Sequence, residues 1–452
     1  MALQASGQIS LDDLHVEAGG TTGTECSLND ADIRNIISKG DGSQNGLSEY
    51  YGQSSAVSGF WAGYAVRLPD GNLTWNNVNI GTPAANRYVI SYHAFRTATG
   101  GGALTIEGAI DSTNNEAEDL VINAGSGKIT LQGAIGSGSN GSVTDLTIGS
   151  VGAGAIDVFQ IGASNSAGAS GSTAIGNSST TTLTLDGTIY NTTGSQTYTA
   201  ATGGNNIVVA SSGTPLGAVA ITTSNADVKF LVSDVTLNNE TSTTITTGGG
   251  AVEFGTALAA VDIETDGNND DTLIIASGAG DVTFTGAIGV THELGGLDVN
   301  ATTAGSGDIT FSGNIGVSGN SAQPGVVGTT AIGTATTENV HFAGSLYSFD
   351  GGTTTITATT DSGGSDDENI EVGATATFLA AGEAITFAGG KIDLANGANL
   401  TITSNNGAID VSGVAGNSDE TVTINAGTST VALGAVGDSG HTEIHNVSVA
   451  GD

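Results

Sequence analysis

Histidine is the residue type in this chain best suited to binding a transition metal, and its six copies are scattered. Only His441 and His445 lie close together, in the segment Gly-His-Thr-Glu-Ile-His. Residues four apart on a β-strand point to the same face, so this pair could supply two ligands. A zinc site needs more ligands, and the one cysteine, Cys26, lies near the other end of the chain. We therefore expect polar surface at the two histidines, a buried thiol at Cys26 and no metal site.

Three acidic clusters could bind calcium, because Ca²⁺ prefers loops rich in carboxylate and amide oxygens. They are Asp266–Asp271, Asp361–Glu368 and the pair Asp419 and Glu420. None has the spacing of an EF-hand loop or of the glycine-rich nonapeptide repeats that bind calcium. We expect solvated turns and no cofactor, and calcium binding at these Asp- and Asn-rich turns is the alternative.

Four other carboxylates, those of Glu253, Asp262, Glu264 and Asp281, could be neighbours if the strands around them stack. Paired carboxylates in a groove hydrolyse glycosidic bonds in many enzymes. Such grooves are usually lined by Trp and Tyr side chains that stack on sugars. After residue 98 the chain has no tryptophan and only three of its eight tyrosines. We predict that the protein is not an enzyme and has no catalytic residues, with a polysaccharide depolymerase as one alternative.

The charge balance disfavours several partners. The chain has 45 Asp and Glu residues against 8 Lys and Arg, a net charge of −37. A polyanion of this size repels both nucleic-acid phosphates and anionic lipids. The first residues have neither the basic stretch nor the apolar core of a signal peptide, and no run of about 18 apolar residues exists. We expect no nucleic-acid partner and no membrane insertion.

A glycine-punctuated motif recurs along most of the chain. Its copies are Gly127-Lys-Ile-Thr-Leu-Gln-Gly-Ala-Ile-Gly136, Gly280-Asp-Val-Thr-Phe-Thr-Gly-Ala-Ile-Gly289 and Gly307-Asp-Ile-Thr-Phe-Ser-Gly-Asn-Ile-Gly316, with a partial copy at Gly102–Ile110. A second strand of related type lies between copies, as in Thr272-Leu-Ile-Ile-Ala276. Short strands that recur every twenty to thirty residues are typical of a solenoid.

The alternation within each copy predicts how such a solenoid is built. Ile129 and Leu131 would point into a common interior and Thr130 outward, because successive residues of a strand face opposite sides. One coil cannot bury its apolar side alone, whereas stacked coils can. The prediction is an all-β protein whose body is a right-handed parallel β-helix or solenoid, with a small N-terminal α+β head. A set of stacked sandwiches or barrels is the competing architecture.

Residue types divide the chain near position 98, since all four arginines and both tryptophans come before it. We expect an N-terminal module over residues 1–55, a small β-rich connector over 56–98 and the repeat body over 99–452. In the module, Gln8–Asp13 is typical of a strand and turn. Ser27 and Asp30 have the spacing of a capping box before a helix whose apolar stripe is Ile33, Ile36 and Ile37.

The repeats with Leu-x-Val-Asn between them resemble β-strand repeats of filamentous-haemagglutinin-like and autotransporter-like proteins. This resemblance covers roughly residues 100–450 and implies a β-helix without specifying an activity. Those families also carry secretion elements that we do not find in this sequence.

The N-terminal segment resembles a different group, uncharacterised virion proteins of marine tailed phages. The resemblance lies in Ser6–Asp13, Ser27–Arg34 and Leu47–Gly52, three blocks in the same order. It implies an attachment module before a projecting β-rich domain, and virion export by lysis needs no signal peptide.

Together these features predict a phage virion protein of fibre or spike type. Its head would dock to other virion proteins, with Ile33, Ile36 and Ile37 as candidate docking residues. Its acidic body would project toward a host-surface glycan or protein, as a homo-oligomer and by resemblance a trimer. A bacterial extracellular adhesin or surface filament protein is the other alternative.

Overall fold

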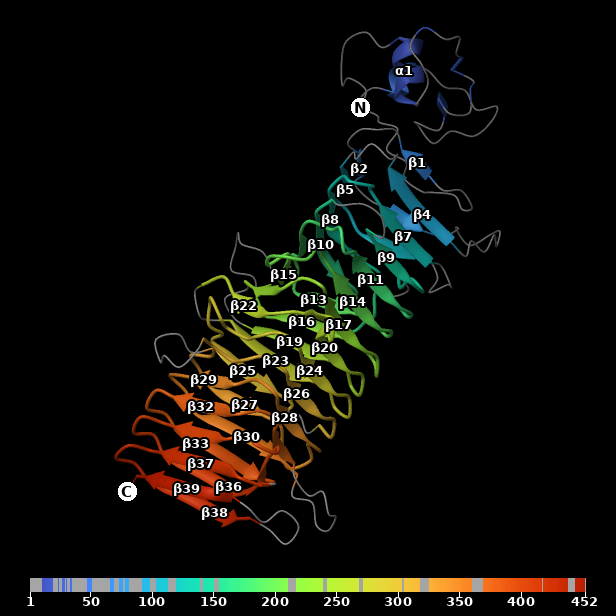
Figure 1. Ribbon diagram of the computed structural model, residues 1–452. Coiled ribbons are helices and arrows are strands. Elements are labelled where there is room, and N and C mark those ends of the chain that lie inside the picture. Colours follow the sequence, from blue (N-terminus) through green and yellow to red (C-terminus); the bar gives the residue numbers. More distant parts are fainter. Residues whose placement is uncertain are drawn as a thin grey trace.

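The computed structural model shows a nearly all-β chain dominated by one parallel solenoid (Figure 1). It describes residues 10–18, 23, 27–28, 30, 33–34, 47–50, 66–68, 73–75, 78–80, 92–97, 103–112, 119–138, 141–149, 154–209, 217–238, 242–267, 271–302, 305–317, 325–359, 369–416, 418–437 and 444–451. The predicted all-β solenoid is confirmed. The sandwich alternative is wrong, because strands pair in parallel with the corresponding strand of the next coil.

Each coil of the solenoid passes through three faces in a fixed order. Face 1 consists of β2 (Leu73–Trp75), β5 (Leu104–Ile106), the first parts of β8 (Ile129–Ile135) and β10 (Ile156–Ile161), β12 (Leu183–Leu185), β15 (Ile207–Val209), β18 (Val235–Leu237), β22 (Ile263–Thr265), β29 (Leu346–Phe349), β32 (Ala376–Ala380), β35 (Leu400–Thr403), β37 (Glu420–Asn425) and β39 (Ile444–Ala450). Isolated parallel bridges at Ile288 and Ile315 connect β22 to β29 on this face.

Face 2 follows face 1 in every coil. It contains β3 (Val78–Ile80), β6 (Ile110–Ser112), the ends of β8 and β10, β13 (Ile189–Asn191), β16 (Val219–Thr222), β19 (Ser242–Thr246), β23 (Thr272–Ala276), β25 (Gly296–Val299), β27 (Thr330–Ile332), β30 (Thr354–Ala358), β33 (Ile385–Gly389) and the first parts of β36 (Ile409–Gly416) and β38 (Val431–Val436).

Face 3 completes the coil. It contains β1 (Val66–Leu68), β4 (Tyr92–Thr97), β7 (Asp119–Asn123), β9 (Leu146–Ile148), β11 (Thr173–Gly176), β14 (Gln196–Thr199), β17 (Val228–Leu231), β20 (Val252–Thr256), β24 (Val282–Phe284), β26 (Ile309–Phe311), β28 (Val340–Phe342), β31 (Ile370–Val372), β34 (Ile392–Leu394) and the ends of β36 and β38. A two-residue strand, β21 (Ala259–Ala260), folds back on β20 as a hairpin.

The four strands found within residues 56–98 belong to the same ladders as the body. β1 pairs with β4, β2 with β5, β3 with β6 and β4 with β7, all in parallel. The β-strands expected in the connector are therefore present, and the backbone pairing continues across the predicted boundary near residue 98.

Inward-pointing side chains form one continuous apolar core along the column. Ile129 and Leu131 are each 2% exposed, whereas Thr130 between them is only half-buried. Val282 pairs in register with Ile309, and both are fully buried. The alternation that predicted the fold is thus the alternation that fills the interior.

Aromatic rings stack through the centre of this core. Tyr198, Phe230, Phe254, Phe284, Phe311 and Phe342 occupy one register position on face 3, with successive ring centroids 5.0, 4.9, 5.3, 4.8 and 5.4 Å apart. Their planes are nearly parallel, an arrangement that offset aromatic pairs favour. Beyond Phe342 the rings continue on other faces, through Tyr347 and Phe378 on face 1 to Phe387 on face 2.

The sequence repeats do not mark a fixed face of the solenoid. In the copy at 127–136, Ile129 lies on face 1 and Ile135 on face 2. In the copy at 280–289, Val282 lies on face 3 and Ile288 on face 1. The motif therefore specifies a strand, a corner and a strand, and more than one of the three corners accepts it.

The head differs from expectation at its start. The expected strand and turn over Gln8–Asp13 is wrong in its described part, because Leu11–Glu17 forms helix α1. Ser10 caps this helix: its side chain accepts the backbone N–H of Asp13, whose carboxylate accepts the backbone N–H of Ser10 at 2.7 Å. A 3-10 helix, η1, covers Leu47–Tyr50.

The helix expected after Ser27 is seen only at Ile33 and Arg34. Its start has the predicted chemistry, since the carboxylate of Asp30 accepts the backbone N–H of Ser27 at 2.7 Å. The backbone N–H of Arg34 donates to the carbonyl of Asp30 at 3.0 Å, as in a helical turn.

Replacing a ring in the aromatic stack tests how far stability depends on the core. Phe284 is 1% exposed between Phe254 and Phe311, so Phe284→Ala leaves a cavity in the column. We expect a loss of about 3–5 kcal/mol in unfolding free energy, measured by guanidinium denaturation. Thr283→Ala, at the outward-facing neighbour, is the matched control and should cost far less. Equal losses for the two variants would contradict the assignment of the interior.

Candidate functional surfaces of the solenoid

Aspartates that immediately precede or begin a strand hydrogen-bond to the next coil. Asp262 comes just before β22, and its Oδ1 accepts the backbone N–H of Ala287 at 2.6 Å. The N–H of Asp262 itself donates to Oδ1 of Asp234 at 2.9 Å, one coil earlier. In each case the donor is the residue directly opposite in the parallel register. This contact is seen at the residues that we call the cross-coil aspartates, namely Asp119, Asp145, Asp227, Asp234, Asp262 and Asp281.

The same position is taken by asparagine in later coils. Oδ1 of Asn399, just before β35, accepts the backbone N–H of Thr421 at 2.9 Å. Oδ1 of Asn314 accepts the backbone N–H of Leu346 at 3.1 Å. The acceptor oxygen is therefore the common feature of the position, with or without a negative charge.

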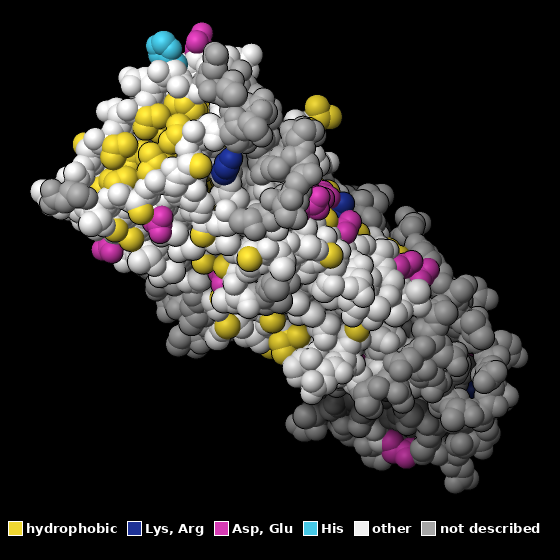
Figure 2. Space-filling view, turned by 90° about the horizontal axis from the view of Figure 1, so that it is seen from below, with side chains coloured by type: hydrophobic (Ala, Val, Ile, Leu, Met, Phe, Trp, Pro, Cys, Tyr) yellow, Lys and Arg dark blue, Asp and Glu magenta, His cyan; other side chains and the backbone are white. Residues whose placement is uncertain are grey.

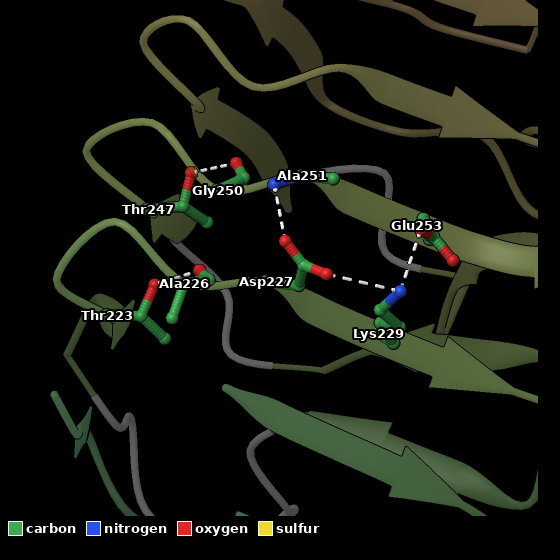
Figure 3. Close-up of polar contacts among 8 residues, drawn as sticks. All are labelled: Thr223, Ala226, Asp227, Lys229, Thr247, Gly250, Ala251 and Glu253. Atoms are coloured by element: carbon green, nitrogen blue, oxygen red, sulfur yellow. Dashed lines mark hydrogen bonds and ion pairs between the residues drawn. The ribbon is translucent and has the colours of Figure 1, made fainter. Parts of the chain in front are cut away.

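Figure 3 shows how one cross-coil aspartate combines with an ion pair on face 3. Oδ1 of Asp227 accepts the N–H of Ala251 at 2.9 Å. Nζ of Lys229 lies 3.2 Å from the other carboxylate oxygen of Asp227 and 2.9 Å from Oε1 of Glu253 on the next coil. The hydrogen bond to Glu253 is the main cause of a raised Lys229 pKa, which keeps the ammonium charged.

Buried hydroxyl groups fix the corners between faces. The Thr223 hydroxyl donates to the carbonyl of Ala226, and the Thr247 hydroxyl does the same to Gly250 (Figure 3). The Ser277 hydroxyl repeats this contact with the carbonyl of Gly280 at 2.5 Å. After Ser277, Gly278 has φ of +67°, a left-handed conformation that favours glycine. These polar residues therefore close turns.

The four carboxylates considered as a glycosidase pair do not form one cluster. Glu253 lies on β20 of face 3, paired with Lys229, and Asp281 precedes β24 on that face. Asp262 directly precedes β22 and Glu264 lies within it, on face 1. Oε1 of Glu264 accepts the N–H of Thr291 at 3.2 Å, and Asp281 accepts that of Asp308 at 3.0 Å. All four serve contacts between coils.

The carboxylates on face 1 are close enough to affect one another. Partial burial raises the pKa of Asp234, the nearby charges of Asp262 and Glu264 raise it further, and the N–H of Asp262 opposes the shift. Each of these carboxylates accepts a hydrogen bond from a backbone N–H, and these bonds stabilise the column of like charges.

Glu420, one of the residues in the acidic pair considered for calcium, has a different role. Its side chain is fully buried where the chain enters β37. Oε1 accepts the N–H of Gly397 at 2.8 Å, and Oε2 accepts the N–H of Ser418 at 2.7 Å. Burial alone raises the pKa of Glu420, but these backbone donors outweigh it, so its pKa lies below the ordinary value of 4.5.

The remaining candidate ligands are dispersed or lie outside the described residues. His445 is exposed on β39, while His441 and Cys26 lie outside the described residues. The acidic cluster at 361–368 and the centre of the acidic cluster at 266–271 also lie outside the described residues. Among the residues that the structure describes, no group of three or more His, Cys, Asp or Glu side chains could hold a metal ion.

The candidate docking residues are seen only in part. The side chain of Ile33 is fully buried, as are those of Leu14 and Tyr50 in the head. Ile36 and Ile37 lie outside the described residues.

Comparison with known proteins adds no assignment. No protein-family model matches the chain, no curated protein matches it, and no solved structure matches it. Across the described ranges, no helix combines the length and the hydrophobicity needed to span a bilayer.

The cross-coil hydrogen bond can be tested at Asp262. Asp262→Ala leaves the N–H of Ala287 without this acceptor, and we expect a loss of about 1 kcal/mol in unfolding free energy. Asp262→Asn keeps an acceptor oxygen and removes a charge close to Asp234 and Glu264, so its loss should be smaller. Chemical denaturation measures both, and an asparagine variant as unstable as the alanine variant would show that charge matters more than the hydrogen bond.

The lowered pKa of Glu420 predicts how its contribution to stability depends on pH. A carboxyl group whose folded pKa is depressed stabilises the fold above the unfolded value and loses that effect as pH falls through the folded value. Glu420→Gln should therefore lower the melting temperature most at neutral pH, and the difference from the natural protein should shrink below pH 4.5. Asp410→Asn, which removes an exposed carboxylate from β36, is the control. A difference that stays constant from pH 7 to pH 3 would contradict this role.

Proposed function

We propose that the protein is a non-enzymatic structural component of a phage virion, of fibre or spike type. Residues 1–55 attach it to other virion proteins, and the acidic solenoid projects outward for host-surface adhesion or decoration. The observation that carries the proposal is the continuous apolar core, which makes a long rigid column from short repeats.

The shape of the molecule supports a projecting role. In Figure 1, α1 lies beyond β1 at one end of the column, and β38 and β39 lie at the other end. Because the coils are joined by parallel ladders on three faces, bending the column strains several ladders together. Such a column keeps its two ends a fixed distance apart, as a spacer between a particle and a surface must.

The virion location rests on the resemblance of the N-terminal blocks to marine tailed-phage proteins. A host glycan or protein is the proposed partner of the column, and the net charge of −37 argues against a nucleic acid. Assembly as a homo-oligomer, by resemblance a trimer, belongs to the same proposal.

The column would serve a bacterial surface adhesin equally well, and genome context separates the two: capsid and tail genes for one, secretion genes for the other. A depolymerase is less favoured, because Glu253, Asp262, Glu264 and Asp281 lie on two faces and bond to neighbouring coils. If the protein released reducing ends from host polysaccharide, the depolymerase would become the favoured function.

Removing the head tests the attachment role. A variant lacking residues 1–55 should be absent from particles purified on a density gradient, whereas the full chain should be present at a fixed copy number by immunoblot. Circular dichroism and a cooperative melt would show that the truncated column remains folded. A folded, truncated protein that still copurifies with particles at the full-length level would contradict the proposal.

A further inference from the structure

One flank of the column has no charged residue on its strands over four successive coils. These coils place β13, β16, β19 and β23 on face 2, and none of the four strands contains Asp, Glu, Lys or Arg. Their outward side chains form two rows in parallel register. We call these eight residues the face 2 patch: Ile189, Ala220, Thr244 and Ile274 in one row, and Asn191, Thr222, Thr246 and Ala276 in the other.

The other two faces of the same coils are charged. Face 3 carries the ion pair of Lys229 and Glu253 (Figure 3). Face 1 carries the neighbouring carboxylates of Asp234, Asp262 and Glu264. Figure 2 shows acidic side chains scattered along one side of the column and few basic ones. The face 2 patch therefore differs from the flanks on either side of it.

Carboxylates adjoin the patch without entering it. Asp271 directly precedes β23, but its side chain is fully buried and adds no charge to the surface. In the next coil Ile274 pairs with Asp298, and the uncharged stretch of this row ends there.

The patch also presents aliphatic groups to the outside. Ile189 and Ile274 point outward and are only half-buried, unlike the aliphatic side chains of the core. Phe159 is 40% exposed at the corner that leads into face 2. Ile161, two residues later, pairs with Tyr190, so Phe159 lies one coil before Ile189. Covering these groups removes apolar surface from water, which favours association.

The charge of the chain favours a second copy as the occupant. Copies with a net charge of −37 repel one another, so a contact between them needs a surface that brings no carboxylates together. Within these coils the strands of face 2 meet this condition, whereas faces 1 and 3 do not. Three short strands around an axis already enclose the interior of each coil. Three copies of face 2 around a common axis would enclose a similar triangle, which the patch would fill.

We propose that the face 2 patch is the surface through which copies of the chain associate side by side, as a parallel trimer whose axis runs along the columns. This inference rests on the homo-oligomer of the proposed function and names its interface. Because the axis is parallel to the columns, all heads lie at one end and all copies of β38 and β39 at the other, as projection from a particle requires (Figure 1). The symmetry also places each residue of the patch at the same height as its own copies.

Aspartates in the patch test the interface. The double variant Thr244→Asp and Ile274→Asp places two carboxylates per chain around the axis, at positions that are paired in register. Light scattering after size-exclusion chromatography should give three times the chain mass of 44.2 kDa for the natural protein and the single chain mass for this variant. Both side chains point outward, so the column should still fold, which circular dichroism checks.

The matched control is the double variant Thr283→Asp and Thr310→Asp. These two threonines are also half-buried, outward and paired in register, but they lie on face 3. We expect this variant to remain trimeric.

Disulfide formation gives a second measurement that adds no charge. The chain has one cysteine, Cys26, so Cys26→Ser provides a background without thiols. In that background Thr244→Cys should give a covalent dimer on a non-reducing gel after mild oxidation, because copies of residue 244 meet near the axis. Thr283→Cys should stay a single chain.

The outcomes separate this inference from the proposal on which it rests. A trimer that survives the face 2 substitutions, or that cross-links through residue 283 and not through residue 244, would overturn the choice of face and leave the homo-oligomer standing. A natural protein that is a dimer would overturn the three-fold arrangement. A monomeric natural protein would overturn both the interface and the homo-oligomer, whereas attachment through residues 1–55 is decided by the truncation experiment.

Discussion

Each inward-pointing side chain in this column packs against the side chain one coil before it and the one after it, and this contact ties the coils together. Its geometry is demanding, since parallel strands in register place like positions directly over one another. The stack from Tyr198 to Phe342 satisfies it by repeating a ring at one position. Where the next residue on face 3 is Val372, rings from Tyr347 and Phe378 fill the centre from face 1. The interior must therefore be filled to the same extent in every coil, but the face that supplies the large side chain can change.

The same stacking would place like charges over one another on the outside, and the cross-coil aspartates show how the fold accommodates them. Each carboxylate accepts an N–H from the residue directly opposite, so a charge at a strand start provides a coil-to-coil bond. Charge-assisted hydrogen bonds to backbone donors stabilise a carboxylate even beside another, as at Asp234 and Asp262. The acidity of the chain is therefore partly structural, and it does not by itself indicate a cationic ligand.

The sequence was sufficient to predict the inward set, because a two-residue alternation places the apolar side chains on one side of each strand. The regular recurrence of these strands favoured a solenoid over stacked sandwiches or barrels. Ile129 and Leu131 were predicted inside and are buried. The face of each repeat could not be predicted, since more than one corner accepts the same motif. The cross-coil aspartates had a readable signal, Asp directly before an apolar-x-apolar strand, but only register shows that the next coil supplies the donor. At Ser10, a local capping box overrode the short alternation that suggested a strand.

These properties separate what the flanks and the ends of the column can do. Along the flanks, backbone groups are paired from coil to coil and outward residues such as Thr130 do not fill the core, so outward positions can vary without disturbing the stack. At an end, the inward residues lose half of their neighbours, and Val436 and Val449 show the consequence directly. Outward positions on the flanks therefore tolerate sequence change, whereas inward positions must keep the core filled.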